Sequence, residues 1–366
     1  ISDPAVDVVV ELIGGTRLAK EFILKALRLG KPVVTANKAL LAEHGAEIHA
    51  VAEQNKTEVY YEASVGGGIP IIKALREGLC ANHIESIYGI LNGTCNYILT
   101  RMEREKLPFD QVLAEAQKAG YAEAEPSLDI DGIDTAHKAV VLASLAYGFQ
   151  IQMSEAHVEG IRGLADADIC YAAELGYRIK LLAIIKQVKG EVEVRVHPTL
   201  VPHSHMLASV SGVFNAIMLK GDIVGDTLYY GRGAGRAATS SAVLSDLADV
   251  ALNLVSGAKN RLPSFVRNGV RGTVRPIGKI GARYYLRLSL LDKPGVLARV
   301  AQILGMHQIS IASVMQKEAR VGEYVPVIIV THSATEDDFR KALLEIDSMD
   351  VVSAPTVRLR IEDFGN

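Results

Sequence analysis

The sequence of 366 residues contains no tryptophan and only three cysteines, Cys80, Cys95 and Cys170, which lie far apart. Three scattered cysteines are too few for a disulfide framework and do not form a CxxC metal site, so we expect a protein of the reducing cytoplasm. Long apolar runs are also missing. The longest, near residues 139–149, is too short for a membrane span, which needs about 20 apolar residues.

An excess of charge of either sign is absent as well. The chain has 39 basic and 42 acidic residues, for a net charge of −3. This balance argues against nucleic acid or a membrane surface as a partner. Since 49% of the residues are hydrophobic, general disorder is excluded, and the length suits two or three domains with real cores.

The first 63 residues alternate short apolar strands with helical stretches. Strands are predicted at 8–13, 32–35 and 58–63, with helices at 18–29 and 39–53. Apolar strands without polar alternation are typical of a parallel sheet covered on both faces, which predicts a partial Rossmann-type, doubly wound domain at 1–63. The chain has no initiator Met or signal peptide and enters a strand at once. We therefore expect that the first part of this domain is missing.

The remainder of the chain predicts two further units. Residues 64–257 indicate a mixed α+β domain, and residues near 232–257 are expected to contribute to the first domain as well. The elements expected in this domain are strands at 83–91, 178–188 and 191–200, two strands near 212–231, and helices at about 95–106, 109–119, 133–148 and 237–256. Pro70 is well placed to start a helix after a triple glycine.

Residues 258–281 contain Gly, Pro and basic residues without a periodic pattern, and we interpret them as a linker. After the linker, residues 282–366 predict a compact unit of the order βαββαβ, which is the ferredoxin-like arrangement. Its strands are expected at 284–291, 309–317, 324–331 and 351–361, and its helices at 295–306 and 335–347.

An acidic loop at residues 120–132 leads into an apolar helix. Asp134 and Lys138 are four residues apart, so they share one face near the start of this helix. A buried helix would hold them at the edge of a core, where carboxylates can bind an ammonium group and a lysine can transfer a proton. The alternative is a solvated loop with a surface ion pair, which contributes about 0.3–0.5 kcal/mol.

Three other segments combine a turn with groups that can bind a ligand. Lys38 follows a strand at the edge where α/β sheets bind ligands, although it could equally be a solvent lysine of a first helical turn. The loop 62–70 can bind an anion or, through carbonyl oxygens, a cation, unless it is only a turn that needs positive φ. The loop 231–235 reads GxGxG, which does not meet the dinucleotide fingerprint but allows close approach of a ligand or a tight turn.

Three histidines, His197, His203 and His205, lie within nine residues of one another. A zinc site would need further Cys, His or acidic ligands at set spacings, and none appears nearby. The segment is also rich in proline. A structural loop is therefore favoured over a metal site.

Seven segments, in this order, resemble the bacterial homoserine dehydrogenases that carry a C-terminal ACT domain: DVVVELIGGT, VVTANKALLA, EASVGGGIPII, ILNGTCNYIL, GYAEAEPSLDIDGIDTAHK, VHPTLVP and GRGAGRAATSSAV. The tail that starts YYLRLSLLDKPGVLARV resembles an ACT domain. The match covers essentially the whole chain. It implies a substrate and dimerisation domain at 64–257 and an ACT domain at 282–366, while the family's first strand and GxGxxG loop are not in this sequence.

The resemblance implies an enzyme that reversibly oxidises L-homoserine to L-aspartate 4-semialdehyde with NAD or NADP, in threonine, methionine and isoleucine biosynthesis. Lys138 is then the proton donor and acceptor, and Lys38 contacts both the nicotinamide and the substrate. The implied substrate-binding residues are Thr94, Gly120, Tyr121, Glu123, Asp129 and Asp134, and the implied cofactor-binding residues are Gly14, Gly15, Thr16, Lys38 and Gly235. Glu62, Val65, Gly67 and Ile69 would bind a sodium ion, largely through backbone carbonyls.

The resemblance also implies a homodimer or homotetramer that is feedback-regulated through the ACT domain, with threonine as the expected effector. Two alternatives remain. A truncated, non-catalytic chain would retain only amino-acid binding, and the missing phosphate loop is the feature that favours it. A dehydrogenase for a different amino-acid aldehyde is the second alternative, and the close match of residues 120–138 argues against it.

Overall fold

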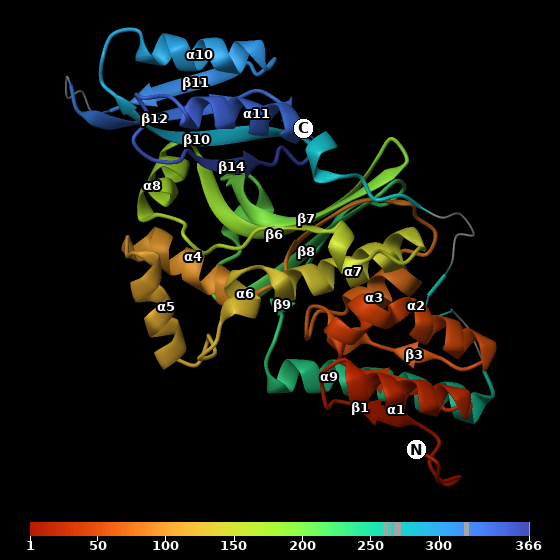
Figure 1. The fold of residues 1–366 in the computed structure, drawn as a ribbon. Helices are drawn as coiled ribbons and strands as arrows, with labels where there is room; N and C mark the ends of the chain where they lie inside the picture. Colours follow the sequence, from red (N-terminus) through yellow and green to blue (C-terminus); the bar gives the residue numbers. More distant parts are fainter. Residues whose placement is uncertain (259–262, 264, 267–271, 318–321, 366) are drawn as a thin grey trace.

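The computed structural model describes residues 1–366 except 259–262, 264, 267–271, 318–321 and 366. The described residues form a small parallel sheet near the N-terminus and a large mixed sheet that reaches into the C-terminal unit (Figure 1). Among the helices described, none is both long enough and apolar enough to cross a membrane.

The small sheet has the order β1-β2-β3 and is parallel, as predicted. Its strands are β1 (Val9–Glu11), β2 (Val33–Thr35) and β3 (Val59–Tyr60), and the connecting helices are α1 (Arg17–Arg28) and α2 (Lys38–Gln54). The first strand ends earlier than expected because the carboxylate of Glu11 accepts hydrogen bonds from the backbone N–H groups of Ile13 and Gly14, at 2.9 and 3.1 Å. These bonds turn the chain out of the sheet.

Helices cover both faces of this small sheet. Val33 and Val59 belong to the core that α1 and α2 share, whereas the next residues, Val34 and Tyr60, pack against α9 (Arg236–Ser256). Successive strand residues point to opposite faces, so α9 lies on the face opposite α1 and α2. A helix from late in the chain thereby completes the N-terminal layer (Figure 1).

The large sheet has the order β11-β12-β10-β14-β7-β6-β4-β8-β9. The strands from the middle of the chain pair antiparallel with their neighbours, and they confirm the strands predicted there. They are β4 (Ile84–Ile90), β6 (Tyr177–Val188), β7 (Glu191–Pro202), β8 (Phe214–Gly221) and β9 (Gly225–Arg232). A short strand, β5 (His157–Val158), pairs parallel with β7.

The helices of the middle region pack on one another and on this sheet. They are α3 (Ile71–Lys73), α4 (Gly93–Glu105), α5 (Phe109–Lys118), α6 (Ser127–Ile130), α7 (Ile133–Tyr147) and α8 (Asp166–Glu174). The expected helix α7 is buried against β4, β6 and β7, in line with its continuous apolar run. The short elements α6, α8 and β5 were not predicted, because each is too short to show a clear apolar period.

Shorter turns connect these elements. They are the 3₁₀ turns η1 (Glu62–Ser64), η3 (Met153–Glu155), η4 (Met206–Ser209) and η5 (Ile277–Lys279), and the single π-helical turn η2 (Ala74–Gly78), which continues α3. As expected, α3 starts directly after Pro70.

The C-terminal unit has the predicted βαββαβ order, with a short extra strand. Its elements are β10 (Gly281–Leu291), α10 (Val296–Met306), β11 (Ile311–Gln316), β12 (Tyr324–Thr331), β13 (Ala334–Thr335), α11 (Glu336–Asp347) and β14 (Val357–Ile361). Both helices cover one face, where Tyr284 and Phe339 stack with ring centroids 3.7 Å apart. The last strand begins at Val357 and not at 351, because Thr356 is held back by two hydrogen bonds to Asp347.

The C-terminal strand β14 joins this unit to the rest of the molecule. It pairs antiparallel with β10 and parallel with β7, through Arg360 opposite Thr199 and Ile361 opposite Leu200. The sequence pattern did not reveal this junction. Much of the predicted linker, namely 259–262, 264 and 267–271, lies outside the described residues, while Val274 near its end forms a bridge to Val192 in β7.

Candidate functional site

A cavity of about 460 Å³ opens between the start of α4, the α6–α7 corner and the loop that precedes α9. It gathers polar side chains from segments that are far apart in the sequence. Its lining consists of Lys38, Leu91, Asn92, Gly93, Thr94, Gly120, Tyr121, Ala122, Glu123, Asp129, Asp134, Lys138, Val213, Arg232, Gly233, Ala234 and Gly235. The structure thus brings both predicted catalytic lysines and all six predicted substrate-binding residues to one cavity.

Two lysines share one carboxylate at the inner end of this cavity. Lys138 Nζ lies 2.7 Å from Asp134 Oδ2, and Lys38 Nζ lies 2.7 Å from Asp134 Oδ1. Burial alone would raise the pKa of Asp134, but the ammonium groups of Lys138 and Lys38 outweigh burial and hold this pKa well below its usual value. The carboxylate is therefore ionised at neutral pH.

The surroundings fix Lys138 in place. Its side chain is 9% exposed, and its ammonium group also donates a hydrogen bond of 2.7 Å to the backbone carbonyl of Leu91. The side chain of Lys38 is 39% exposed and reaches the same carboxylate from the start of α2. One lysine is thus held rigidly between two acceptors, and the other approaches from the side of the small sheet.

Asn92 connects this cluster to a second carboxylate, and sequence reasoning did not identify it. Its amide nitrogen donates to Asp129 Oδ1 at 2.7 Å and to Asp134 Oδ2 at 2.9 Å, while its amide oxygen accepts from the backbone N–H of Cys95. An asparagine directly before a helix is an ordinary capping signal, which hides this additional role. The sequence signal that could have identified Asn92 was its position inside ILNGTCNYIL, one of the segments that resemble the family.

The outer wall of the cavity comes from α4 and the loop after α5. The hydroxyl of Thr94 donates to the carbonyl of Tyr121 at 2.8 Å, and the ring of Tyr121 packs against Tyr97 with centroids 4.6 Å apart. Gly120 has a φ of 74°, which lets the chain turn before Tyr121 and Glu123. The side chain of Tyr121 remains about half exposed at the rim.

The residues predicted to bind a cofactor fall into two places. Gly235 and Lys38 line the main cavity, whereas Thr16 lines a neighbouring cavity of about 380 Å³ at the start of α1. Gly14 and Gly15 form the turn between β1 and α1, where both have φ near 70°. The amide of Asn37 donates to the carbonyl of Gly15 at 2.8 Å, so the loops after β1 and β2 are tied together at the carboxyl edge of the sheet.

The loop 62–70 lies beneath the loop that precedes α9. Gly68 N–H donates to the carbonyl of Arg232 at 3.1 Å, and a methyl group on Gly67 would lie only 2.5 Å from the carbonyl oxygen of Gly233. The carboxylate of Glu62 accepts backbone hydrogen bonds from Ile72 and Lys73, at 2.9 and 2.8 Å. Burial nevertheless raises the pKa of Glu62 to about 7. The four predicted sodium-binding residues, Glu62, Val65, Gly67 and Ile69, thus belong to one tightly folded loop.

The three histidines of the segment 197–205 have different surroundings. His197 is buried in β7, where Arg195 Nη1 donates to its Nε2 at 3.3 Å. A guanidinium can only donate, so this ring is neutral, and burial lowers the pKa of His197 well below its usual value. His205 stacks on Phe364 with centroids 3.6 Å apart. Within the described part of the chain, no group of three or more His, Cys, Asp or Glu side chains is placed to hold a metal ion.

Comparison with protein-family models gives three matches along the chain. Residues 1–62 match the NAD-binding domain of homoserine dehydrogenase, residues 70–248 match homoserine dehydrogenase, and residues 284–348 match the ACT domain.

Individual relatives agree with these models. A homoserine dehydrogenase from Pseudomonas aeruginosa is 50% identical over 99% of this chain and 84% of its own length. The crystal structure of a homoserine dehydrogenase from Thiobacillus denitrificans superposes with a TM-score of 0.93, at 47% identity over 98% of this chain and 82% of that chain. A hyperthermophilic archaeal homoserine dehydrogenase in complex with NADPH matches 68% of this chain and 72% of its own, with a TM-score of 0.60 and 31% identity.

The matched models cover the small sheet with Lys38, most of the cavity with Lys138, and the C-terminal unit from β10 to α11 in turn. This chain therefore belongs to the homoserine dehydrogenase family, which consists of NAD(P)-dependent oxidoreductases that act on a CH–OH group, and it carries a C-terminal ACT domain.

Proposed function

We propose that the 460 Å³ cavity is the site where L-homoserine and L-aspartate 4-semialdehyde are interconverted, with Lys138 and Lys38 as catalytic residues. The observation that carries this proposal is the carboxylate of Asp134, which lies 2.7 Å from both ammonium groups. This arrangement presents two positive charges to a substrate oxygen in a cavity that is also lined by the carboxylates of Glu123 and Asp129.

The remaining polar groups suit an amino-acid substrate. Homoserine carries an ammonium group, and Glu123 and Asp129 supply carboxylates to the lining of the cavity. Thr94, Gly120 and Tyr121 form the rim, where a hydroxyl and backbone groups can hydrogen-bond to the substrate. Asn92 holds Asp129 and Asp134 at a fixed separation, because one amide nitrogen donates to both.

Lys138 performs the proton transfer in this scheme. An ammonium group has three N–H donors, and Lys138 directs two of them to Leu91 and Asp134, which leaves one for the substrate oxygen. In the direction of aldehyde reduction, negative charge develops on that oxygen and Lys138 protonates it. In the reverse direction, the lysine takes the proton from the hydroxyl group. Lys38 adds a second positive charge beside the same oxygen.

A bound nicotinamide cofactor would supply the redox chemistry, as the hydride acceptor when the alcohol is oxidised and, in its reduced form, as the hydride donor when the aldehyde is reduced. Gly14, Gly15 and Thr16 would hold the cofactor at the carboxyl edge of the small sheet, and Lys38 and Gly235 would contact it next to the substrate. The fit is supported by open space beside Gly14 and Gly15, where an added methyl group would meet no atom within 4 Å. It is supported further by the NADPH complex of the archaeal relative.

A sodium ion is proposed at the loop 62–70. Sodium is a hard cation that prefers oxygen ligands, and backbone carbonyls of Glu62, Val65, Gly67 and Ile69 are the candidate ligands. The buried position of Glu62, Val65 and Ile69 supports this proposal, because an ion bound within this loop would be shielded from competing water. The ion would stabilise the loop 62–70, which packs against the loop before α9.

We further propose a cytoplasmic enzyme that acts as a homodimer or homotetramer and responds to threonine at the ACT domain. The proposed limits are 1–63 with 232–257 for the nucleotide-binding domain, 64–257 for the substrate and dimerisation domain, 258–281 for the linker and 282–366 for the ACT domain. The match of an ACT model to residues 284–348 supports the last of these limits.

The first test is homoserine-dependent reduction of NAD and of NADP by the purified chain, followed at the absorbance of the reduced nicotinamide. We expect turnover with at least one cofactor. Turnover that does not depend on homoserine, or that survives substitution of both Lys38 and Lys138 by alanine, would contradict the proposed site.

A further inference from the structure

Residues 157–162 lie between the C-terminal unit and the corner of α6 and α7 that carries Asp129 and Asp134. We propose that Glu159 is a positioning residue: by binding the arginines of β14, it fixes this corner and thereby the substrate-binding carboxylates. The inference rests on the proposed substrate site and adds to it a residue that touches neither substrate nor cofactor.

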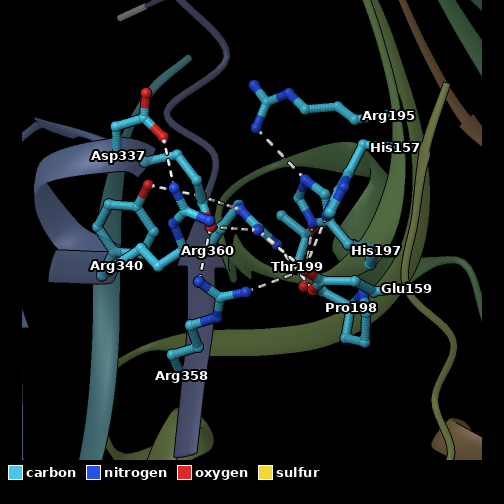
Figure 2. A network of polar contacts seen from close by, with 12 residues as sticks. His157, Glu159, Arg195, His197, Pro198, Thr199, Asp337, Arg340, Arg358 and Arg360 are labelled. Carbon is cyan, nitrogen blue, oxygen red and sulfur yellow. Dashed lines mark hydrogen bonds and ion pairs between the residues drawn. The ribbon is translucent and has the colours of Figure 1, made fainter. Parts of the chain in front are cut away.

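The first link is a cluster of charges between the two units (Figure 2). Arg360 donates two hydrogen bonds to the Glu159 carboxylate, at 2.8 and 2.9 Å, and its side chain is only 3% exposed. Arg358 lies 3.4 Å from the same carboxylate, and His157 Nε2 lies 2.8 Å from it. Two-point pairing of this kind fixes direction as well as distance.

Both arginines are shared with a second carboxylate. Glu336 at the start of α11 accepts two hydrogen bonds from Arg360 and one from Arg358. Glu336 belongs to the C-terminal unit, so this half of the cluster holds the arginines within their own unit. Glu159 is the member of the cluster that connects the arginines to the substrate domain.

The second link joins the segment of Glu159 to the corner. The backbone N–H of Ile161 donates to the carbonyl of Ile130, the last residue of α6, at 2.7 Å. Gly160 has no room for a side chain, because a methyl group there would overlap the carbonyl of Ile130. A methyl group on Gly132, which caps α7, would meet the carbonyl of Glu159 at 3.3 Å. The backbone of Gly160 therefore packs directly on the corner.

The third link leads from the corner to the cavity. Asp129 lies in α6 and Asp134 in the first turn of α7, and both accept a hydrogen bond from Asn92. Arg162 binds Asp131 between them, at 2.8 and 3.1 Å. A displacement of residues 157–162 would therefore move the two carboxylates relative to Lys38, which lies at the start of α2.

The test compares Glu159→Gln with Asp168→Asn in the full chain. Asp168 in α8 forms a second contact to the C-terminal unit, where its carboxylate binds Arg287 at 2.6 and 2.9 Å and Tyr285 at 3.0 Å. It is a similar buried inter-unit pair, but α8 packs mainly on β6 and α4. Asp168→Asn therefore weakens the contact between the two units without changing a residue that packs on the corner of α6 and α7.

We expect Glu159→Gln to raise KM for homoserine about fivefold or more, the range of a typical coupling energy. Because the same displacement moves Asp134, which binds both lysines, kcat should fall as well. KM for the nicotinamide cofactor should stay the same, since Gly14, Gly15 and Thr16 lie at the edge of the small sheet. Asp168→Asn should lower the midpoint of thermal unfolding while leaving KM for homoserine unchanged. An unchanged KM in Glu159→Gln, or an equal rise in both variants, would overturn the inference.

If Glu159→Gln does not fold, Arg358→Lys provides the test, and KM for homoserine is again compared with that of Asp168→Asn. Arg358 is suited to this because it is partly exposed and makes the longest of these contacts to Glu159. A separate variant, Asp129→Asn, tests the proposed substrate site independently of the positioning role of Glu159. If it leaves KM for homoserine unchanged, the proposed substrate site is wrong. If it raises KM while both Glu159→Gln and Arg358→Lys do not, only the positioning role fails.

Discussion

Lys138 Nζ lies 2.7 Å from Asp134 Oδ2, one helical turn away on α7, and both side chains are about nine-tenths buried. In the proposed scheme, this pair would place a proton donor in the substrate cavity with its charge balanced. The second lysine, Lys38, comes from the start of α2 and binds the other oxygen of the same carboxylate. The position of Asp134 therefore determines the geometry of both lysines.

Replacing Lys138 by alanine should reduce kcat by about 10²–10⁴-fold, the usual contribution of a positioned acid–base group. KM for homoserine should change much less, since Asp129 and Glu123 remain. Steady-state kinetics in both directions measures this, with Lys118→Ala at the exposed end of α5 as the control. Near-normal turnover in Lys138→Ala would remove this residue from the proton-transfer role.

Asp134→Asn should destabilise the fold by about 3 kcal/mol at pH 7, because a buried ammonium group loses its partner. The pKa of Asp134 is lower in the native state than in the unfolded chain, so its stabilisation is complete above about pH 5 and is lost as the pH falls below 4. Urea unfolding at several pH values measures both effects. The variant should lose less stability than the parent chain between pH 5 and pH 3, and equal losses would contradict this assignment.

Asp129→Asn should raise KM for homoserine more than tenfold, because a carboxylate that binds an ammonium group is lost while Asn92 keeps a hydrogen-bond partner. Glu125 provides a matched control in the same loop, since it is exposed and binds the hydroxyl of Ser127 outside the cavity. Glu125→Gln should therefore leave KM unchanged. A similar rise in both variants would indicate a general effect of charge and not a binding contact.

The carboxyl group of Glu62 should make stability depend on pH in the opposite direction. Its native pKa of about 7 lies above the ordinary value of 4.5, so its ionisation in the folded state costs free energy as the pH rises from 4.5 to 7. Glu62→Gln should remove this loss of folding stability between pH 4.5 and pH 7. Sodium bound to the carbonyl of Glu62 would favour the ionised form, so sodium chloride should reduce the loss in the parent chain relative to choline chloride. Identical pH profiles in the two salts would count against the sodium site.

The sequence allowed the pairing of Asp134 with Lys138 on a buried helix to be predicted because its signals are local. Asp134 and Lys138 are four residues apart on a helix that is apolar on all sides, and these two facts together place an ion pair at the edge of a core. The parallel strands β1 to β3 and the βαββαβ order were predicted for the same reason. Each depends on apolar patterns and turn residues within a single stretch of chain.

Contacts between distant segments were not predicted. Asn92 has the sequence signature of a helix cap, and its bonds to Asp129 and Asp134 depend on how α4 packs against α6. Glu159 and Arg360 are single charges in unremarkable surroundings, and no local pattern pairs them. The pairing of β14 with β7 involves only two residue pairs, so it has no counterpart in the periodicity of either strand.

The position of β14 has a consequence for synthesis on the ribosome. One edge of β7 is shared by β5, by Val274 and by β14, and the last of these ends at Ile361. While the chain is being translated, the middle region can fold before β14 has emerged. Until then, this part of β7 presents unpaired backbone groups, which are a template for aggregation. The nascent protein is therefore expected to depend on chaperones most strongly before β14 has left the exit tunnel.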